Sequence, residues 1–392
     1  MSRELARRGH DVAHSFLARE RTQKGLLERR PGDPASLVFM PIRRGSDSSR
    51  RGMARRIRHE VLYGRRLVRA AAAYRPDVVI SANTPLAAQW QLMTWSHRSG
   101  TGFVYWMQDL ISVAVRQHVR RRFAWIELPV ARLARWLERS SLVGADGVVA
   151  VTPAFRGPLA KYRVRAENIA VIPNWAPLDD IVPVERRNPW AMDHGLADDL
   201  VFLYAGALGS KHDPTLLIQL AQTLPVTVVV VSESFGVAAV KAQAARLGLD
   251  NIRVVPVQPY EQLSQVLGSA DVLVATLDRK GSAHSVPSKV LSYLCAERPI
   301  LALIARENLA AAVVTESGGG IVVEPDDVPG ALAAARELAQ NETQRHELAR
   351  RGRAYAERTF DIQRIGDEFE AVLARASAAG HGRAKSHGLR AW

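Results

Sequence analysis

Two segments of the sequence combine glycine, serine and lysine in the way that proteins use to bind phosphate. The first follows the apolar run Val201–Ala205 and reads G-A-L-G-S-K-H-D-P over residues 206–214. Its Asp-Pro pair is typical of a helix start, so a glycine-containing turn joins the end of a strand to a helix N-terminus. Backbone N–H groups at such a turn can bind a phosphate, and a lysine adds a point charge. The expected contacts are Gly206, Gly209 and Lys211, although an ordinary turn with a surface lysine has the same pattern.

The second segment follows the apolar run Val272–Ala275 and reads D-R-K-G-S-A-H-S-V-P-S-K-V-L-S-Y-L over residues 278–294. Ser288 is a typical N-cap, and Lys289 falls in the first turn of the helix that follows. A lysine in that position opposes the helix dipole, and a bound diphosphate would remove the conflict. The alternative is that Lys289 is simply a solvated side chain.

Both segments follow strands, and open parallel sheets bind ligands at the carboxyl ends of their strands. Together they predict a site for a nucleotide diphosphate. Short apolar runs alternate with helical stretches along the chain, which indicates parallel sheets with right-handed crossovers. The strands that we expect cover residues 12–17, 37–42, 78–81, 102–106, 146–151 and 168–172, and then 201–205, 227–232, 252–257, 272–275, 300–304 and 320–323.

The two series of strands predict two α/β domains. We expect an N-terminal Rossmann-like domain over residues 1–173 and a C-terminal nucleotide-binding domain over residues 200–360. Residues 174–199 are rich in proline and aspartate and predict a linker. A last helix over 361–376 is expected to cross back, and residues 377–392 lack an apolar face and are expected to be disordered.

The composition fits this organisation. The chain has 392 residues, 47% of them hydrophobic, which suffices for two cores. Its single cysteine, Cys295, lies in an apolar stretch and predicts a core position; one cysteine excludes an internal disulfide and fits a reducing compartment. The sequence has no apolar run of about 18 residues and no signal peptide, so we expect a cytoplasmic protein.

The net charge of +14 indicates an anionic partner, although a biased composition that favours arginine and alanine gives the same value. One local cluster is more specific. Residues 116–140, which overlap a long helix expected over 125–143, alternate arginine with tryptophan, phenylalanine and leucine. Such a segment suits the surface of an anionic membrane, but a core helix with a solvated basic face is the alternative. The basic run Arg43–Arg58 is a second candidate.

Six segments, in order, resemble the retaining GT-B glycosyltransferases of family four, and within it the branch that builds exopolysaccharide, capsule and O-antigen chains. The clearest is the P-S-K segment with its continuation, Y-L-C-A-E-R-P-I-L. The six segments cover residues 4–12 (E-L-A-R-R-G-H-D-V), 104–110 (V-Y-W-M-Q-D-L), 171–175 (V-I-P-N-W), 204–211 (Y-A-G-A-L-G-S-K), 285–301 and 324–327 (E-P-D-D). The resemblance spans about residues 4–375 and implies two Rossmann-like domains that face a cleft.

The resemblance implies a nucleotide-sugar donor and a retaining mechanism in which positioning and charge stabilisation do the catalytic work. The sugar is expected near Gln108 and Asp109, with His284 also at the reacting centre. The residues expected to bind the donor are Gly206, Gly209, Lys211, Ser285, Ser288, Lys289 and Ser292. No metal and no other cofactor is expected.

Three positions depart from the family pattern. His284 and Ser292 stand where many members carry two glutamates, one for the sugar and one for the ribose. Ala207 stands where many relatives have an arginine beside the phosphates, which places more weight on Lys211. The donor sugar therefore cannot be assigned from these residues.

The N-terminal part of the pattern starts inside a first helix, at residues 2–8. An open Rossmann sheet places a strand before that helix, in the middle of the sheet. Without such a strand, the strands at 12–17 and 78–81 would flank a gap with unpaired backbone groups. We therefore expect upstream codons for a short apolar strand and a glycine- or proline-rich turn.

The function that fits best is transfer of a sugar from a nucleotide diphosphate to a lipid-linked or polysaccharide acceptor, by an enzyme peripheral on the inner face of the plasma membrane. A nucleotide-sugar epimerase of the same fold and an inactive truncated homologue are the alternatives. The P-S-K segment is not an epimerase pattern. A nucleic-acid binder is a third possibility that rests on charge alone, and no nucleic-acid module is recognisable.

Overall fold

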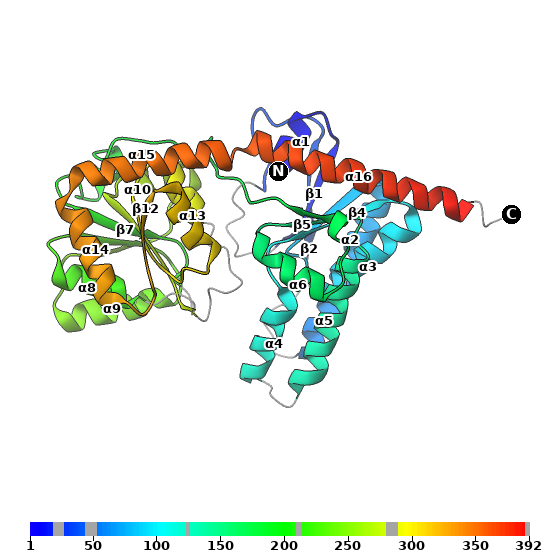
Figure 1. Cartoon of the computed structure of the whole chain (residues 1–392), viewed down its shortest axis with the longest axis horizontal. Coiled ribbons are helices and arrows are strands. Elements are labelled where there is room, and N and C mark those ends of the chain that lie inside the picture. The colour runs from blue at the N-terminus through cyan, green and yellow to red at the C-terminus, as the bar shows by residue number, and fades with distance from the viewer. Residues whose placement is uncertain (19–26, 44–52, 123–125, 209–213, 280–288, 389–392) are drawn as a thin grey trace. The chain divides into compact units, whose positions relative to one another are not determined.

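The computed structural model describes residues 1–18, 27–43, 53–122, 126–208, 214–279 and 289–388 (Figure 1). The chain forms two compact units. One consists of Met1–Asn174 with Ile362–Trp392, and the other of Trp175–Asp361. Each is an α/β unit whose described strands all pair in parallel.

The first unit contains two sheets among its described residues. A four-stranded sheet has the order β3-β4-β5-β6, and β1 pairs with β2 alone. The strands are β1 (Val12–Ala18), β2 (Leu37–Arg43), β3 (Val78–Ala82), β4 (Gly102–Met107), β5 (Gly147–Ala150) and β6 (Ile169–Val171). The helices are α1 (Ser2–Arg7), α2 (Met53–Tyr74), α3 (Leu86–Ser99), α4 (Ile111–Arg122), α5 (Glu127–Val143), α6 (Arg156–Lys161) and α16 (Ile362–Gly388).

The strands β1 and β3 belong to different sheets. In the described part of the unit, β1 is hydrogen-bonded only to β2, and β3 only to β4. The expected separation of these two strands is therefore present. No other described strand pairs with the edge of β1 away from β2 or with the edge of β3 away from β4.

The second unit is a six-stranded parallel sheet of order β12-β11-β10-β7-β8-β9. The strands are β7 (Val201–Ala205), β8 (Thr227–Val231), β9 (Ile252–Val255), β10 (Val272–Leu277), β11 (Ile300–Ile304) and β12 (Gly320–Val323). The helices are α7 (Pro189–Asp193), α8 (Thr215–Thr223), α9 (Gly236–Leu247), α10 (Leu263–Gly268), α12 (Lys289–Cys295), α13 (Leu309–Ser317), α14 (Val328–Gln340) and α15 (Glu342–Thr359).

Helices cover both faces of this sheet, which explains its uninterrupted apolar strands. All residues of β8, β10 and β11 are buried. Alternate residues of a strand reach opposite faces, so Leu203 joins one apolar cluster and Phe202 the other. Cys295 is fully buried in the first of these clusters, which confirms its core position, and burial raises the pKa of its thiol to about 12.

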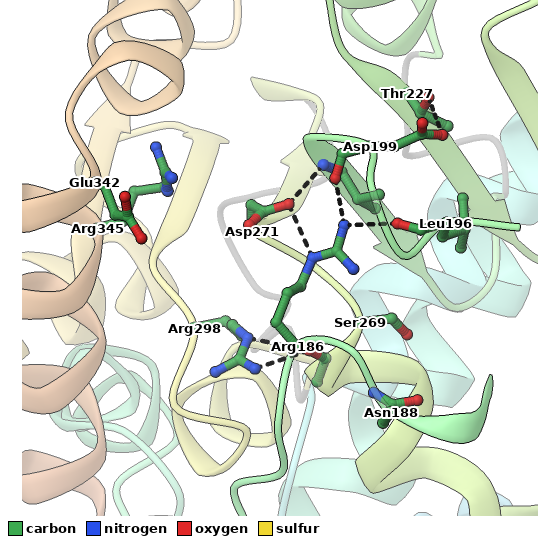
Figure 2. Close-up of polar contacts among 12 residues, drawn as sticks. Arg186, Asn188, Leu196, Asp199, Thr227, Ser269, Asp271, Arg298, Glu342 and Arg345 are labelled. Carbon is green, nitrogen blue, oxygen red and sulfur yellow. Dashed lines mark hydrogen bonds and ion pairs between the residues drawn. The ribbon is translucent and has the colours of Figure 1, made fainter. Parts of the chain in front are cut away.

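The segment 174–199 is not a linker, and that prediction is wrong from Trp175 onward. Figure 2 shows the Arg186 side chain as the centre of a polar network at the start of the sheet. Its guanidinium donates to Asp271 (Nε to Oδ2, 2.9 Å) and to the carbonyls of Leu196 and Asp199 (3.0 and 2.5 Å). Asp271 also accepts from the backbone N–H of Val201 at 2.7 Å. The segment is therefore fixed to the second unit, because its charged residues pair with groups at the strand starts.

The tail prediction is also wrong for residues 377–388, because α16 continues to Gly388. Small residues allow this helix to pack closely. A Cβ added to Gly380 would lie 2.6 Å from the carbonyl oxygen of Gly100, and one added to Gly100 would lie 2.6 Å from the Cβ of Ala384. Arg383 binds the Asp146 carboxylate and donates to the carbonyl of Thr101 at 3.0 Å. The glycine and alanine content thus serves close contact, and residues 389–392 lie outside the described part.

Two helix boundaries also differ from expectation. The long helix expected over 125–143 is α5, which begins at Glu127, and a separate helix, α4, precedes it. The sequence also predicts helical structure over residues 330–357, and the structure divides this region into α14 and α15. The division falls at Asn341, whose side chain accepts from the N–H of Gln344 and so caps α15.

Candidate functional site

The carboxyl edge of the second sheet brings together two of the residues expected to bind phosphate. The strand β7 ends at Ala205, and Gly206 follows it with φ of +126°, a backbone conformation that favours glycine. Lys289 begins α12 and reaches this turn. A Cβ added to Gly206 would lie 3.7 Å from both Cε and Nζ of Lys289. The two segments singled out in the sequence are therefore in contact.

The Lys289 ammonium group has an unusual environment. Its Nζ donates to the phenolic oxygen of Tyr204 at 2.6 Å and lies 3.9 Å from the centre of that ring. Burial lowers the Lys289 pKa to about 7, and no described carboxylate offsets this effect. Tyr204 cannot act as the counter-anion, because burial raises its own pKa. Lys289 is thus a half-buried residue whose amine an anion would recharge.

The glycine turn uses two of its backbone donors within the protein. The N–H of Gly206 donates to the carbonyl of Val231 at 3.0 Å, and the N–H of Leu208 donates to the Ser234 hydroxyl at 2.6 Å. These two amides already have partners. We therefore expect phosphate contacts from Lys289 and from residues 209–211, which lie outside the described residues.

Most of the other predicted donor-binding residues fall in undescribed segments. Gly209, Lys211, His284, Ser285 and Ser288 lie outside the described residues, so their predicted roles stay predictions.

Ser292 is a predicted donor-binding residue that the structure does describe. It is half-buried on α12, one turn beyond Lys289. Its neighbour Tyr293 has a positional role that the sequence analysis did not assign. The Tyr293 hydroxyl accepts from the N–H of Ala205 at 3.0 Å and lies 3.3 Å from the carbonyl of Val274. It ties α12 to the end of β7 and to the middle of β10. In the sequence, this tyrosine is part of the Y-L-C-A-E-R-P-I-L stretch that resembles the family pattern, and that resemblance could have indicated its role.

In the first unit, Gln108 and Asp109 directly follow β4, at the carboxyl edge of its sheet. Gln108 and Asn174 form a reciprocal amide pair: each side-chain amide donates to the other's carbonyl, at 3.0 and 2.9 Å. Asp109 is exposed. Two of the six family-like segments, 104–110 and 171–175, therefore meet here. Asn174 was not assigned a role from the sequence, although the I-P-N-W pattern contained it.

A buried carboxylate holds the helix that follows Asp109. Glu138 on α5 is fully buried and accepts from the backbone N–H of Ser112 (3.2 Å), the Ser112 hydroxyl (2.5 Å) and the Tyr162 hydroxyl (3.1 Å). Ser112 lies in the first turn of α4, so Glu138 supplies the acceptor that this helix start needs. The position of the 108–110 turn depends on this contact through α4.

The helices α4 and α5 lie side by side and extend beyond the sheet of their unit (Figure 1). Leu128, Leu133 and Trp136 on α5 are 60%, 50% and 50% exposed. Three exposed arginines share this helix: Arg132, Arg135 and Arg139. Apolar and basic side chains therefore share the solvent-facing surface of α5. The side chains of Arg121, Arg122, Phe123 and Trp125, part of the predicted membrane contact, lie outside the described set.

The described residues offer neither a metal site nor a membrane-spanning helix. They contain no group of three or more His, Cys, Asp or Glu side chains that could hold a metal ion. None of the helices in the described ranges is long and apolar enough to cross a membrane.

Comparison with protein families matches almost the whole chain to two models. Residues 1–175 match the Glycosyl transferase 4-like domain, and residues 188–355 match Glycosyl transferases group 1. A curated relative is WcaI of Escherichia coli (strain K12), assigned as a glycosyl transferase of colanic acid biosynthesis. It is 27% identical over 248 residues, which cover 61% of this chain and 60% of that protein.

Solved structures agree on the fold. Sucrose-phosphate synthase from Thermosynechococcus elongatus has a TM-score of 0.75 at 16% identity, covering 96% of this chain and 92% of that one. WaaG, a glycosyltransferase involved in lipopolysaccharide biosynthesis, has a TM-score of 0.68 at 16% identity, covering 95% of this chain and 92% of that one. Anabaena Alr3699/HepE, solved in complex with UDP, has a TM-score of 0.64 at 18% identity, covering 80% of this chain and 82% of that one. These similarities confirm the predicted GT-B fold.

Proposed function

We propose that this chain, which belongs to the glycosyltransferases built from a 4-like and a group 1 domain, transfers a sugar from a nucleotide diphosphate donor to a lipid-linked or polysaccharide acceptor in cell-surface polysaccharide synthesis. The relatives named for colanic acid and lipopolysaccharide biosynthesis support this choice of pathway class. The structure of Anabaena Alr3699/HepE with UDP supports a uridine nucleotide as the first donor to test.

The observation that carries the proposal is the Lys289 amine beside Gly206. A lysine that is partly removed from water, without an acidic partner among the described residues, loses much of its charge near neutral pH, as its pKa of about 7 indicates. A diphosphate placed against it would restore the charge and form charge-assisted hydrogen bonds. The site lies at the carboxyl edge of a parallel sheet, where nucleotides bind in such folds.

In this proposal the remaining predicted residues keep their roles. Lys211, with Gly209, Ser285, Ser288 and Ser292, completes the donor site. Gln108 and Asp109 contact the sugar or the acceptor from the first unit, and His284 lies at the reacting centre. The reaction retains the anomeric configuration, with the leaving diphosphate stabilised by Lys289 and the helix start that it belongs to. No metal ion and no cofactor takes part.

We further propose that the solvent-facing surface of α5 contacts an anionic membrane at the cytoplasmic face. Leu128 and Leu133 would enter the headgroup region, while Arg132 and Arg139 pair with lipid phosphates. The exposure of these apolar side chains beside arginines supports this partner. A lipid-linked acceptor would then meet the enzyme at the membrane.

Donor turnover tests the proposal. The full chain is incubated with UDP-glucose and other nucleotide sugars, with and without a polyprenyl diphosphate-linked acceptor, and nucleoside diphosphate release is measured. Acceptor-dependent release is expected, and proton NMR of the product should show the donor's anomeric configuration. Interconversion of donor epimers without an acceptor would instead establish the epimerase.

A further inference from the structure

Phe235 is the most exposed large apolar side chain of the described residues, with 74% of its surface accessible. It lies in the short connection between β8 and α9, at the carboxyl edge of the second sheet. The strand β8 is the direct neighbour of β7, with Ala205 paired to Val231. Phe235 therefore lies one strand away from the glycine turn. On the other side of that turn, α12 follows β10 and carries Lys289.

The connection that carries Phe235 is fixed to the glycine turn on both sides of the aromatic residue. Before it, the Ser234 hydroxyl accepts from the N–H of Leu208 at 2.6 Å and pairs with the Ser232 hydroxyl at 2.8 Å. After it, the N–H of Gly236 donates to the Leu208 carbonyl at 3.1 Å. These contacts hold the backbone of residue 235 at a defined position relative to Gly206.

Gly236 makes this close approach possible. A Cβ at that position would lie 2.4 Å from the carbonyl oxygen of Leu208, closer than real Cβ atoms come. Only glycine allows the start of α9 to reach the turn after β7. The sequence S-E-S-F-G thus presents an exposed aromatic ring on a backbone that is hydrogen-bonded to the glycine turn after β7.

We propose that the ring of Phe235 stacks on the nucleobase of the donor. This inference rests on the proposed function, because it requires the diphosphate to lie against Lys289 beside the glycine turn. A donor held there by its diphosphate carries a flat aromatic base at its other end, and the next strand over presents an exposed aromatic ring. Base and phenyl faces stack favourably, and every base offers such a face, so Phe235 strengthens binding without selecting the base.

Titration calorimetry with two probes tests the inference. Phe235→Ala should weaken binding of UDP about 5- to 100-fold, the range of one base–aromatic stack. Binding of inorganic diphosphate, which has no base, should stay unchanged. Phe235→Tyr should restore UDP affinity, because it retains the ring. Leu247→Ala, on the exposed side of α9, is the matched control and should bind both probes like the parent protein.

Three outcomes would overturn the inference. Unchanged UDP affinity in Phe235→Ala would show that the ring does not touch the base. Equal loss of UDP and inorganic diphosphate would show that the variant only disturbs the turn, as would failure of Phe235→Tyr to recover binding. Failure of the proposed function gives a different pattern: the parent protein then binds none of UDP, GDP, ADP and dTDP, whatever residue occupies position 235.

Discussion

The Lys289 ammonium nitrogen lies 2.6 Å from the phenolic oxygen of Tyr204, and that hydroxyl donates its own proton to the Ala207 carbonyl at 2.8 Å. The tyrosine therefore offers the lysine a lone pair and no charge. This arrangement fixes the direction of the amine and leaves its charge uncompensated within the described residues. Two predictions follow from this pair.

Lys289→Met should weaken UDP binding by about 1.5–3 kcal/mol, the scale of a hydrogen bond to a charged group. The variant should fold normally, because the lysine has no acidic partner in the described part of the chain that the change would leave unpaired. Calorimetry measures the loss, and Lys241→Met on the solvent face of α9 serves as the control. Equal affinities of the Lys289 variant and the control would remove Lys289 from the donor site.

UDP affinity should fall as pH rises above about 7. The pKa of Lys289 is lowered from 10.5 to about 7 in the free protein, and a bound diphosphate raises it again because it favours the charged form. Between about pH 7 and the higher pKa of the complex, UDP binding therefore takes up a proton, and the affinity falls by up to about tenfold for each pH unit that the pH rises. The same shift makes the free protein more stable as pH rises through this window, because the unfolded chain binds a proton there that the folded chain does not.

Calorimetry in buffers of different ionisation enthalpy, from pH 7 to 9.5, measures this proton uptake. Lys289→Met should lose this component of the pH dependence. A pH profile shared by the parent and this variant would contradict the assignment.

Gln108→Ala should lower kcat/KM by about 5- to 100-fold, since it removes two amide hydrogen bonds of about 0.5–1.5 kcal/mol each. UDP affinity should not change, because UDP lacks the sugar that Gln108 is proposed to contact. In a double-mutant cycle, Gln108→Ala with Asn174→Ala should cost less than the sum of the two single changes. Strict additivity would show that the pair does not act together.

Leu128→Gln with Leu133→Gln should reduce sedimentation with vesicles of phosphatidylglycerol and phosphatidylcholine. Arg132→Ser with Arg139→Ser should reduce it too, by about 1 kcal/mol for each charge at low salt, and should weaken its salt dependence. Leu247→Gln in the other unit is the control for a general loss of apolar surface. Undiminished sedimentation of both α5 variants would exclude this surface as the membrane contact.

Glu138→Ala should destabilise the first unit by about 2–4 kcal/mol, because it leaves the buried donors of Ser112 and Tyr162 without their acceptor. Denaturant unfolding measures the change. Tyr105→Phe provides the contrast: within the described residues its buried hydroxyl has no hydrogen-bond partner, so the change should be neutral or stabilising. If Glu138→Ala unfolds like the parent, the carboxylate does not hold α4.

The sequence predicted most of the framework because the framework is built from local patterns. Apolar runs such as those of β8 and β10 mark strands covered on both faces, and the strands β7 and β11 have the bounds that the sequence predicts. The Cys295 core position followed from its apolar neighbours. The two family models and the GT-B similarities then confirm the fold and the transferase class that six short segments had indicated.

The incorrect predictions concern segments whose partners lie far away in the chain. Residues 377–388 have no apolar face and were read as disordered, yet glycine and alanine let them pack as a helix against Gly100. The segment before β7 was read as a linker because proline and aspartate are common in loops. Its Arg186 is held by Asp271, 85 positions along the chain, which no local pattern reveals.

The sequence by itself determined which residues could bind a diphosphate, because glycine turns, helix starts and lysines act through their own backbone neighbourhood. Only the tertiary structure decided how two of them work. It placed Lys289 against Tyr204 and away from any described carboxylate, which lowers its pKa. It also showed that Ser234 occupies the Leu208 amide and holds Phe235 beside the turn. Burial and long-range contacts set these properties, and both arise only when separate strands come together in one sheet.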